Sequence, residues 1–353
     1  KSDLTSQQKA NPPFGGLNAT AISKLKRIFQ SPGPIHEPQG EHPDTFRLAR
    51  ALRAAGFVAG DLVHNTFSYH FTPGAWMLEG GAHALGCCVF PAGVGQTELQ
   101  AQTIALLKPN AYTGTPSFLK IILEKGDELG LDCSSIKKAL VSGEALPPSL
   151  REWFKGRGIA IQSCYATADV GLIAYEAPQV AGMIIDEEVI LEIVEPNGSK
   201  PMPIGEVGEV VVTIFDPDYP LIRFGTGDLS AIDPDSVSQA TACGRTNYRI
   251  KGWLGRADQT TKVKGMFVHP GQIGEIARRH PEIKKIRMVV SGNVGADVMT
   301  LHCEINEKAS DQLSGAIAQS ARDITKLRAE VAFAATGSLP EDGKFIEDAR
   351  TYS

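Results

Sequence analysis

Between residues 42 and 164, short apolar runs alternate with segments of helical periodicity. In residues 42–56, for example, Phe46, Leu48, Ala51 and Leu52 recur at the spacing of one helix face. Apolar runs predict strands at residues 62–67, 87–90, 111–114, 138–142 and 159–164. Helical patterns lie between them, at 75–85, 99–107, 117–129 and 148–155. This alternation predicts a parallel sheet with crossover helices, so we expect an α/β fold.

The pattern changes after residue 168. Alternating runs at 189–194 and 209–215, separated by Pro-, Asn- and Gly-containing turns, predict an antiparallel β-rich unit. From about residue 255, strands at 263–268, 286–291, 299–305 and 330–333 and helices at 271–280 and 310–327 predict a small α+β domain. We therefore expect a large N-terminal domain over residues 1–255, with a β-rich subdomain from 168, and a C-terminal domain over 256–353. Residues 1–40 predict loop with one short helix near 21–29.

Composition narrows the possible function classes. The 353 residues carry 35 Lys and Arg against 40 Asp and Glu, a formal net charge of −5. This balance argues against charge-driven binding to nucleic acid or an anionic membrane. The longest uncharged stretch, residues 80–97, contains His83, Pro91 and several Gly, so we expect no membrane span. Six Cys without C-x-x-C spacing predict reduced thiols in a cytoplasmic protein. A polar start without Met predicts a fragment and no signal peptide.

Common nucleotide and nucleophile motifs are incomplete. Residues 93–98 begin like a dinucleotide fingerprint but lack its third Gly, and residues 337–344 lack the spacing of a phosphate loop of the Walker type. Neither H-E-x-x-H nor G-x-S-x-G occurs. The chemistry must therefore be sought in other segments.

Three segments of the C-terminal half carry candidate charges. In residues 221–229, Asp228 follows two Gly and can accept the two hydroxyl hydrogen bonds of a ribose, although such a turn also occurs without function. In residues 255–265, Arg256 can reach a phosphate or ribose and Asp258 can sit at a hinge, or both can belong to a solvated linker. In residues 339–344, Lys344 lies on a Pro- and Gly-containing loop, or is simply a solvated lysine.

Two further segments follow predicted strands. They are Val141-Ser142-Gly143-Glu144-Ala145-Leu146 and Cys164-Tyr165-Ala166-Thr167-Ala168-Asp169. Ligands of open parallel sheets lie at the carboxyl ends of strands. There Tyr165 can stack on a base, and Asp169 can hold magnesium through oxygen.

Together these segments resemble the adenylate-forming acyl-CoA synthetase superfamily, and more narrowly the phenylacetate–CoA ligase family. Residues 13–15, 95–98 and 115–117 also match family positions. The resemblance implies a mobile C-terminal lid with its hinge near 256–258. It implies ATP, Mg²⁺ and coenzyme A as cofactors, and activation of a carboxylic acid, expected to be aromatic, to an acyl-adenylate that is passed to coenzyme A.

Site roles follow from the same resemblance. Gly143, Glu144 and Ala145 would line an adenine pocket, with Tyr165, Ala166 and Thr167 against the nucleotide. Asp228 would bind the ribose hydroxyls, and Arg256 would lie near ribose and phosphate. Asp169 would bind the metal, and Asp258 would be the hinge. Lys344 would stabilise charge at the α-phosphate, and Lys264 would lie by the acceptor-thiol channel.

The phosphate loop departs from the family pattern. The matching segment reads Ser31-Pro32-Gly33-Pro34-Ile35-His36-Glu37-Pro38. Both Thr hydroxyls and the Lys are missing, Pro offers no N–H to a phosphate, and Glu37 replaces an ammonium by a carboxylate. Only Cys243 remains of a cysteine cluster found in some relatives, so we expect no zinc site.

The acyl pocket and the final function stay open. Phe67, Tyr69 and Phe71 alternate after a predicted strand and suit packing on a flat ring, or are core aromatics. An acid–thiol ligase is one hypothesis. The alternative is a nucleotide- or acyl-binding accessory protein of the same fold that makes no adenylate, which the altered phosphate loop favours. A homodimer, and an amine or carrier as acceptor, are left open.

Overall fold

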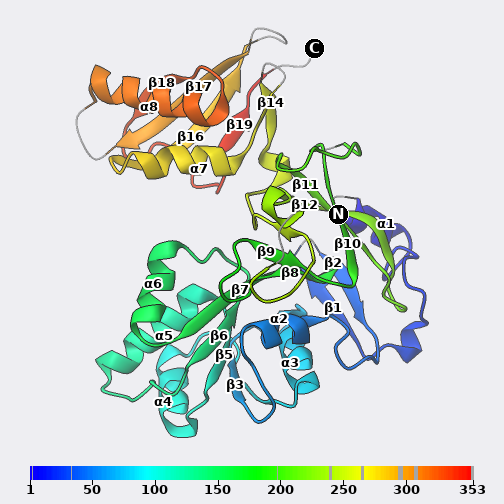
Figure 1. Cartoon of the computed structure of the whole chain (residues 1–353). Helices are drawn as coiled ribbons and strands as arrows, with labels where there is room; N and C mark the ends of the chain where they lie inside the picture. The colour runs from blue at the N-terminus through cyan, green and yellow to red at the C-terminus, as the bar shows by residue number, and fades with distance from the viewer. Residues whose placement is uncertain are drawn as a thin grey trace.

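The computed structural model describes residues 1–353 apart from 2, 33, 197, 238–240, 264–265, 293–296, 306–308 and 351–353, and apart from the side chains of 258, 262, 266 and 267. The part before residue 255 is built on a large mixed sheet, and a smaller sheet with two helices lies above it in Figure 1. The expected α/β class is confirmed.

The large sheet has its strands in the order β13-β9-β8-β7-β6-β5-β3-β4 in the described parts of the chain. Strands β4, β3, β5, β6 and β7 are parallel, and β8, β9 and β13 continue the sheet with antiparallel pairings. The strands are β3 (Leu62–Asn65), β4 (Cys88–Pro91), β5 (Ala111–Gly114), β6 (Lys138–Val141), β7 (Ala160–Thr167), β8 (Gly171–Tyr175), β9 (Met183–Ile185) and β13 (Arg249–Ile250).

Helices cover both faces of this sheet, which explains why its inner strands read as continuous apolar runs. On β6, Leu140 packs into a core with α2 (Leu48–Ala54) and α3 (Gly74–Ala84). The neighbours of Leu140, Ala139 and Val141, face the opposite core. That core contains α4 (Thr97–Leu107), α5 (Pro116–Glu128) and α6 (Pro148–Gly156).

The expected antiparallel unit is a three-stranded sheet. Its strands are β10 (Val189–Val194), β11 (Gly208–Ile214) and β12 (Leu221–Ser230), paired in that order. Two short 3₁₀ turns follow, at Pro234–Val237 and Ala257–Gln259. The strands β8 and β9, which the apolar pattern did not single out, belong to the large sheet instead.

The last hundred residues form a second core. Strands β16 (Ile283–Ser291), β17 (Val298–Ile305), β18 (Glu330–Ala334) and β19 (Ile346–Asp348) form a sheet in the order β18-β17-β16-β19. Helices α7 (Pro270–Arg279) and α8 (Asp311–Thr325) pack on it through Ile273, Ile276 and Ile317. The strand expected at 263–268 is instead the antiparallel pair β14 (Thr261–Val263) and β15 (Met266–Val268). A domain boundary at 255/256 remains a prediction.

The N-terminal 40 residues differ most from expectation. A helix, α1 (Leu4–Ala10), and a 3₁₀ turn at Ile22–Lys24 precede the hairpin of β1 (Arg27–Ser31) and β2 (Ile35–Gln39). The expected helix near 21–29 is therefore wrong beyond that single turn. None of the helices in the described parts of the chain has the length and apolar character needed to span a bilayer.

Candidate active site

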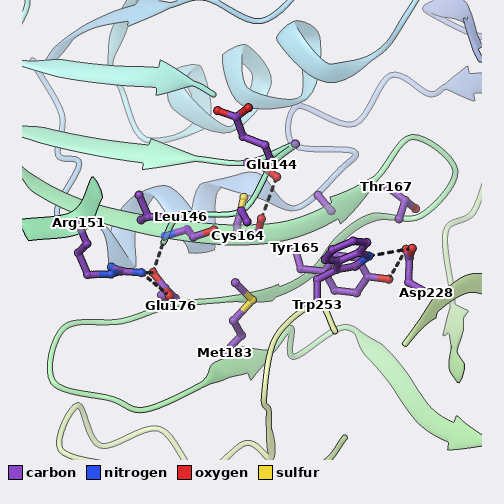
Figure 2. Close-up of a pocket in the computed structure, with 15 residues that line it drawn as sticks. Glu144, Leu146, Arg151, Cys164, Tyr165, Thr167, Glu176, Met183, Asp228 and Trp253 are labelled. Atoms are coloured by element: carbon purple, nitrogen blue, oxygen red, sulfur yellow. Dashed lines mark hydrogen bonds and ion pairs between the residues drawn. The ribbon is translucent and has the colours of Figure 1, made fainter. Parts of the chain in front are cut away.

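A cavity of about 520 Å³ opens where β6 and β7 end, at the carboxyl edge of the parallel strands (Figure 2). This is the edge at which open α/β sheets bind ligands. Its lining residues are Ser142, Gly143, Glu144, Ala145, Leu146, Arg151, Ser163, Cys164, Tyr165, Ala166, Thr167, Glu176, Met183, Asp228 and Trp253. Segments separated by more than 80 residues therefore meet here, as the resemblance to the family implies.

Asp228 is the centre of a hydrogen-bond cluster at one end of the cavity. Its Oδ2 accepts the Tyr165 hydroxyl at 2.9 Å. Its Oδ1 accepts Trp253 Nε1 at 3.1 Å and Arg256 Nη1 at 3.2 Å. Burial, reinforced by the Asp228 charge, raises the pKa of the Tyr165 phenol well above its ordinary value, so Tyr165 remains a neutral donor. Asp228 is thus a nearly buried acceptor, 8% exposed, held in a defined orientation.

Gly227 lets the guanidinium of Arg256 lie close to strand β12, although the sequence predicted a turn at this position. Gly227 has φ +75°, and a Cβ there would lie 2.8 Å from Arg256 Nη2. The backbones of Asp228 and Arg256 also form an isolated antiparallel bridge. The positive φ therefore favours glycine here, and a larger residue would also displace the Arg256 guanidinium.

The loop after β6 forms one wall of the cavity. Gly143 has φ +83°, which favours glycine, and the Ser142 hydroxyl donates to the Cys164 carbonyl at 2.8 Å. The Glu144 carboxylate accepts the backbone N–H of Ser117 at 2.6 Å, in the first turn of α5. Figure 2 shows this carboxylate pointing away from Tyr165. Glu144 therefore lines the cavity while its charged group fixes the loop to α5.

Comparison with known proteins gives a consistent result. Residues 41–213 match the family model described as AMP-binding enzyme. The chain is 28% identical to the phenylacetate-coenzyme A ligase of Thermus thermophilus over 341 residues, 91% of this chain and 76% of that protein. It is 30% identical to the Escherichia coli phenylacetate-coenzyme A ligase over 78% of this chain and 64% of that protein.

These similarities support the adenylate-forming, phenylacetate–CoA ligase-like family. Solved structures agree on the fold. A structure described as an open conformation of 2-hydroxyisobutyryl-CoA ligase with 2-HIB-AMP and CoA has a TM-score of 0.86 at 23% identity, covering 99% of this chain and 80% of that one. The same ligase described in its thioesterification state has a TM-score of 0.66 at 22% identity, covering 99% of this chain and 79% of that one.

Asp169, the predicted magnesium ligand, lies in surroundings that bear on that role. Its side chain is fully buried, and Oδ2 forms an ion pair with Lys1 Nζ. Oδ1 is buried without a hydrogen-bond partner, but Asp169 is not among the residues that line the cavity. Within the described part of the chain no three His, Cys, Asp or Glu side chains gather as metal ligands. A carboxylate neutralised by an ammonium and shut off from the cavity does not fit a magnesium site in this arrangement.

The segment that aligns with the family's phosphate loop is a β-hairpin. Ser31 and Glu37 lie on facing strands, and the Ser31 hydroxyl donates to Glu37. The Gln8 side chain binds both the N–H and the carbonyl of His36, at 2.8 Å each. Burial raises the pKa of the Glu37 carboxyl from 4.5 to about 7. The segment is thus held by side chains, and Pro32 and Pro34 are exposed near its tip.

The three aromatic candidates for an acyl pocket lie in different environments. Phe67 is half-buried, and its ring would lie 3.7 Å from a Cβ at Gly143, beside the loop after β6. The Tyr69 hydroxyl donates to Glu79 at 2.7 Å and accepts from Asn65 at 2.9 Å. Phe71 is 74% exposed. Phe67 thus lies beside a residue that lines the cavity, and a substrate role stays a prediction for each of the three.

Lys344, a candidate in the described portion of the C-terminal part, does not line the cavity. Lys344 is exposed between β18 and β19, and its N–H donates to Asp342, which binds Arg287 of β16. The next residue, Phe345, donates its N–H to Gln259 at 3.3 Å, so Lys344 lies close to the predicted hinge. Lys264 and the side chain of Asp258 lie outside the described residues.

Sequence reasoning missed five residues that line the cavity, among them Ser163 on β7. Arg151 and Glu176 form a two-pronged ion pair at the end opposite Asp228, Met183 lies between, and Trp253 covers Asp228 (Figure 2). Trp253, 54% exposed and three residues before Arg256, offered a usable signal. The Arg151–Glu176 pair offered none, because no local pattern links two residues on different elements.

Proposed function

We propose that this chain uses ATP to activate a carboxylic acid, expected to be aromatic, as an acyl-adenylate and transfers the acyl group to coenzyme A. The observation that carries the proposal is Asp228, a nearly buried carboxylate at one end of a cavity walled by Gly143 and Tyr165. The cavity lies at the ligand-binding edge of the sheet. The match to the AMP-binding family model and the similarity to curated phenylacetate–CoA ligases support the reaction class.

In the first step a carboxylate oxygen of the acid attacks the α-phosphorus of ATP, and the bond to the pyrophosphate oxygen breaks. Asp228 accepts the ribose hydroxyls, and Gly143 to Ala145 and Tyr165 to Thr167 enclose the adenosine. Arg256, adjacent to Asp228, lies where the ribose meets the phosphate. Charge stabilisation and positioning are the main demands of this chemistry. Magnesium enters only as the counter-ion of the ATP phosphates.

In the second step the sulfur of coenzyme A attacks the acyl carbon and AMP leaves. The acyl group is expected on the Phe67 side of the cavity, and Lys264 beside the acceptor thiol. Lys344 serves the first step by offsetting charge at the α-phosphate. Because it lies beside Gln259 rather than in the cavity, this role requires rotation of the C-terminal part about a hinge at Asp258. The higher TM-score with the ligase structure described as open is consistent with an arrangement before that rotation.

The second candidate function is an accessory protein that binds a nucleotide or acyl-adenylate without making it. The hairpin 27–39 favours it, because Glu37 stands where the family carries an ammonium and Pro32 and Pro34 cannot donate to phosphate. A buried carboxylate facing pyrophosphate would oppose ATP binding once it is ionised.

Pyrophosphate release from ATP with a panel of aromatic and short hydroxy acids separates the two functions. The ligase predicts release with at least one acid, thioester formation when coenzyme A is added, and a loss of release of about 10²-fold or more in Lys344→Ala. Lys326→Ala, an exposed lysine at the end of α8, is the control. Release that is unaltered in Lys344→Ala would refute the role of Lys344. Binding of AMP without release for any acid would favour the accessory protein.

A further inference from the structure

The cavity has a second charged end that the roles above do not use. Arg151 on α6 and Glu176, just after β8, line it at the end opposite Asp228 (Figure 2). Between the two ends, Ser163 and Tyr165 lie two residues apart on β7, about 7 Å along an extended strand. A nucleoside whose ribose is bound by Asp228 therefore directs its base toward Glu176.

The ion pair holds the Glu176 carboxylate in a fixed orientation. Arg151 Nη2 donates to Oε1 at 2.8 Å and to Oε2 at 3.1 Å, and Arg151 Nη1 donates to the Ile161 carbonyl at 3.2 Å. The backbone N–H of Ser163 donates to Oε2 at 2.7 Å. Oε2 thus accepts two hydrogen bonds and Oε1 one, so Oε1 can accept another. The side chain of Glu176 is 19% exposed, enough to contact a ligand in the cavity.

We infer that Glu176 selects the nucleobase, accepting a hydrogen bond from the 6-amino group of adenine, with Arg151 as its positioning residue. The inference rests on the proposed nucleotide site. An ionised carboxylate only accepts hydrogen bonds, and adenine presents an amino donor at carbon 6. Guanine and hypoxanthine carry a carbonyl oxygen at that carbon, which offers Glu176 no proton and is repelled by its charge. Leu146 and Met183 supply apolar surface near the same end.

Calorimetric titration with AMP and IMP tests this without knowledge of the acid, because the two ligands differ in the purine only at carbon 6 and its neighbour N1. The wild type is expected to bind AMP about tenfold or more tightly than IMP. In Glu176→Gln, whose amide both donates and accepts, the two affinities should lie within about threefold of each other. Arg151→Lys should reduce the preference for AMP less, since an ammonium keeps the charge beside Glu176 but lacks the second nitrogen that binds the Ile161 carbonyl. Glu152→Gln, on the exposed side of α6 and paired with Lys155, is the matched control and should keep the wild-type ratio.

If the ratio of AMP to IMP affinity stays unchanged in Glu176→Gln while both affinities fall, the Arg151–Glu176 pair only stabilises the fold, and the inference is overturned. Equal binding of AMP and IMP by the wild type, or binding of neither, would overturn it as well. If the variant does not fold, purine riboside 5′-monophosphate on the wild type decides, since it lacks any group at carbon 6 and should bind more weakly than AMP and more tightly than IMP. If the wild type releases pyrophosphate but the AMP to IMP affinity ratio does not change in Glu176→Gln, the inference about Glu176 is refuted and the ligase function stands. A Glu176-dependent ratio without release would refute the ligase and leave the inference standing.

Discussion

Replacing Glu37 with glutamine should stabilise the protein at pH 8 much more than at pH 5. Glu37 is 1% exposed, its Oε1 accepts the Ser31 hydroxyl, and its Oε2 is buried without a hydrogen-bond partner. Burial raises its pKa from 4.5 to about 7. The folded protein therefore keeps this proton up to about pH 7, whereas the unfolded chain releases it near pH 4.5.

The sign follows from proton linkage. Between pH 4.5 and 7 the folded state binds more protons than the unfolded state, so stability falls as the pH rises. The penalty is absent below the unfolded pKa and complete above the folded one. The difference between the two pKa values corresponds to about 3.5 kcal/mol. About 1 kcal/mol of this penalty is already present at pH 5, so the advantage of Glu37→Gln should grow by about 2.5 kcal/mol between pH 5 and pH 8.

Urea unfolding of both proteins at pH 5 and pH 8, followed by Trp fluorescence, measures this quantity. Subtracting wild type from variant at each pH removes the other titrating groups, which both proteins share. Glu41→Gln, at an exposed position just after β2, controls for loss of a carboxylate from this segment. A difference between Glu37→Gln and wild type that is the same at both pH values, within about 0.5 kcal/mol, would refute the assignment of a buried, protonatable carboxyl.

Three further substitutions test the site and the fold. Asp228→Ala should weaken AMP binding by about tenfold or more in calorimetry, because it removes the ionised acceptor of the ribose hydroxyls; equal affinity would place the ribose elsewhere. Trp253→Phe should abolish most of the fluorescence change on AMP binding, because the indole N–H shares Asp228 with the ribose; a change of unaltered size would assign the signal to another Trp. Gly171→Ala should lower the unfolding free energy by about 2 kcal/mol or more, because Gly171 has φ +82° and its Cβ would lie 2.8 Å from the Phe46 carbonyl oxygen; a change below 0.5 kcal/mol by urea unfolding would show that the backbone can relax.

The local hydrophobic pattern was sufficient to predict a strand where the strand is buried on both faces of the sheet. Strand β6 is apolar at Ala139, Leu140 and Val141 because these positions face two different helix layers, so a short continuous run predicts it without knowledge of its neighbours. The hairpin at 27–39 is the opposite case. Its second strand buries Glu37, Pro38 and Gln39. These residues do not show the alternation of apolar and polar positions from which a strand could be predicted.

The candidate site divides in the same way. Tyr165 and the loop at Gly143 could be predicted to meet, because both lie at the ends of predicted parallel strands, which share one edge of the sheet. Asp228 lies in the antiparallel strand β12, and only the resemblance to the family placed it beside them. The position of Lys344 beside Gln259 could not be predicted from the sequence, because it depends on how the C-terminal part is placed against the rest.

The sequence by itself therefore determined the layered α/β class and the order of the strands and helices between residues 42 and 164, since these depend on periodicity and on residues adjacent in the chain. Only the tertiary structure decided that Arg151 faces Glu176, that Glu37 is buried against Ser31, and that Asp169 pairs with Lys1. Those are contacts between distant segments. Their energies come from desolvation and charge pairing in a cavity or core that exists only once the chain has folded.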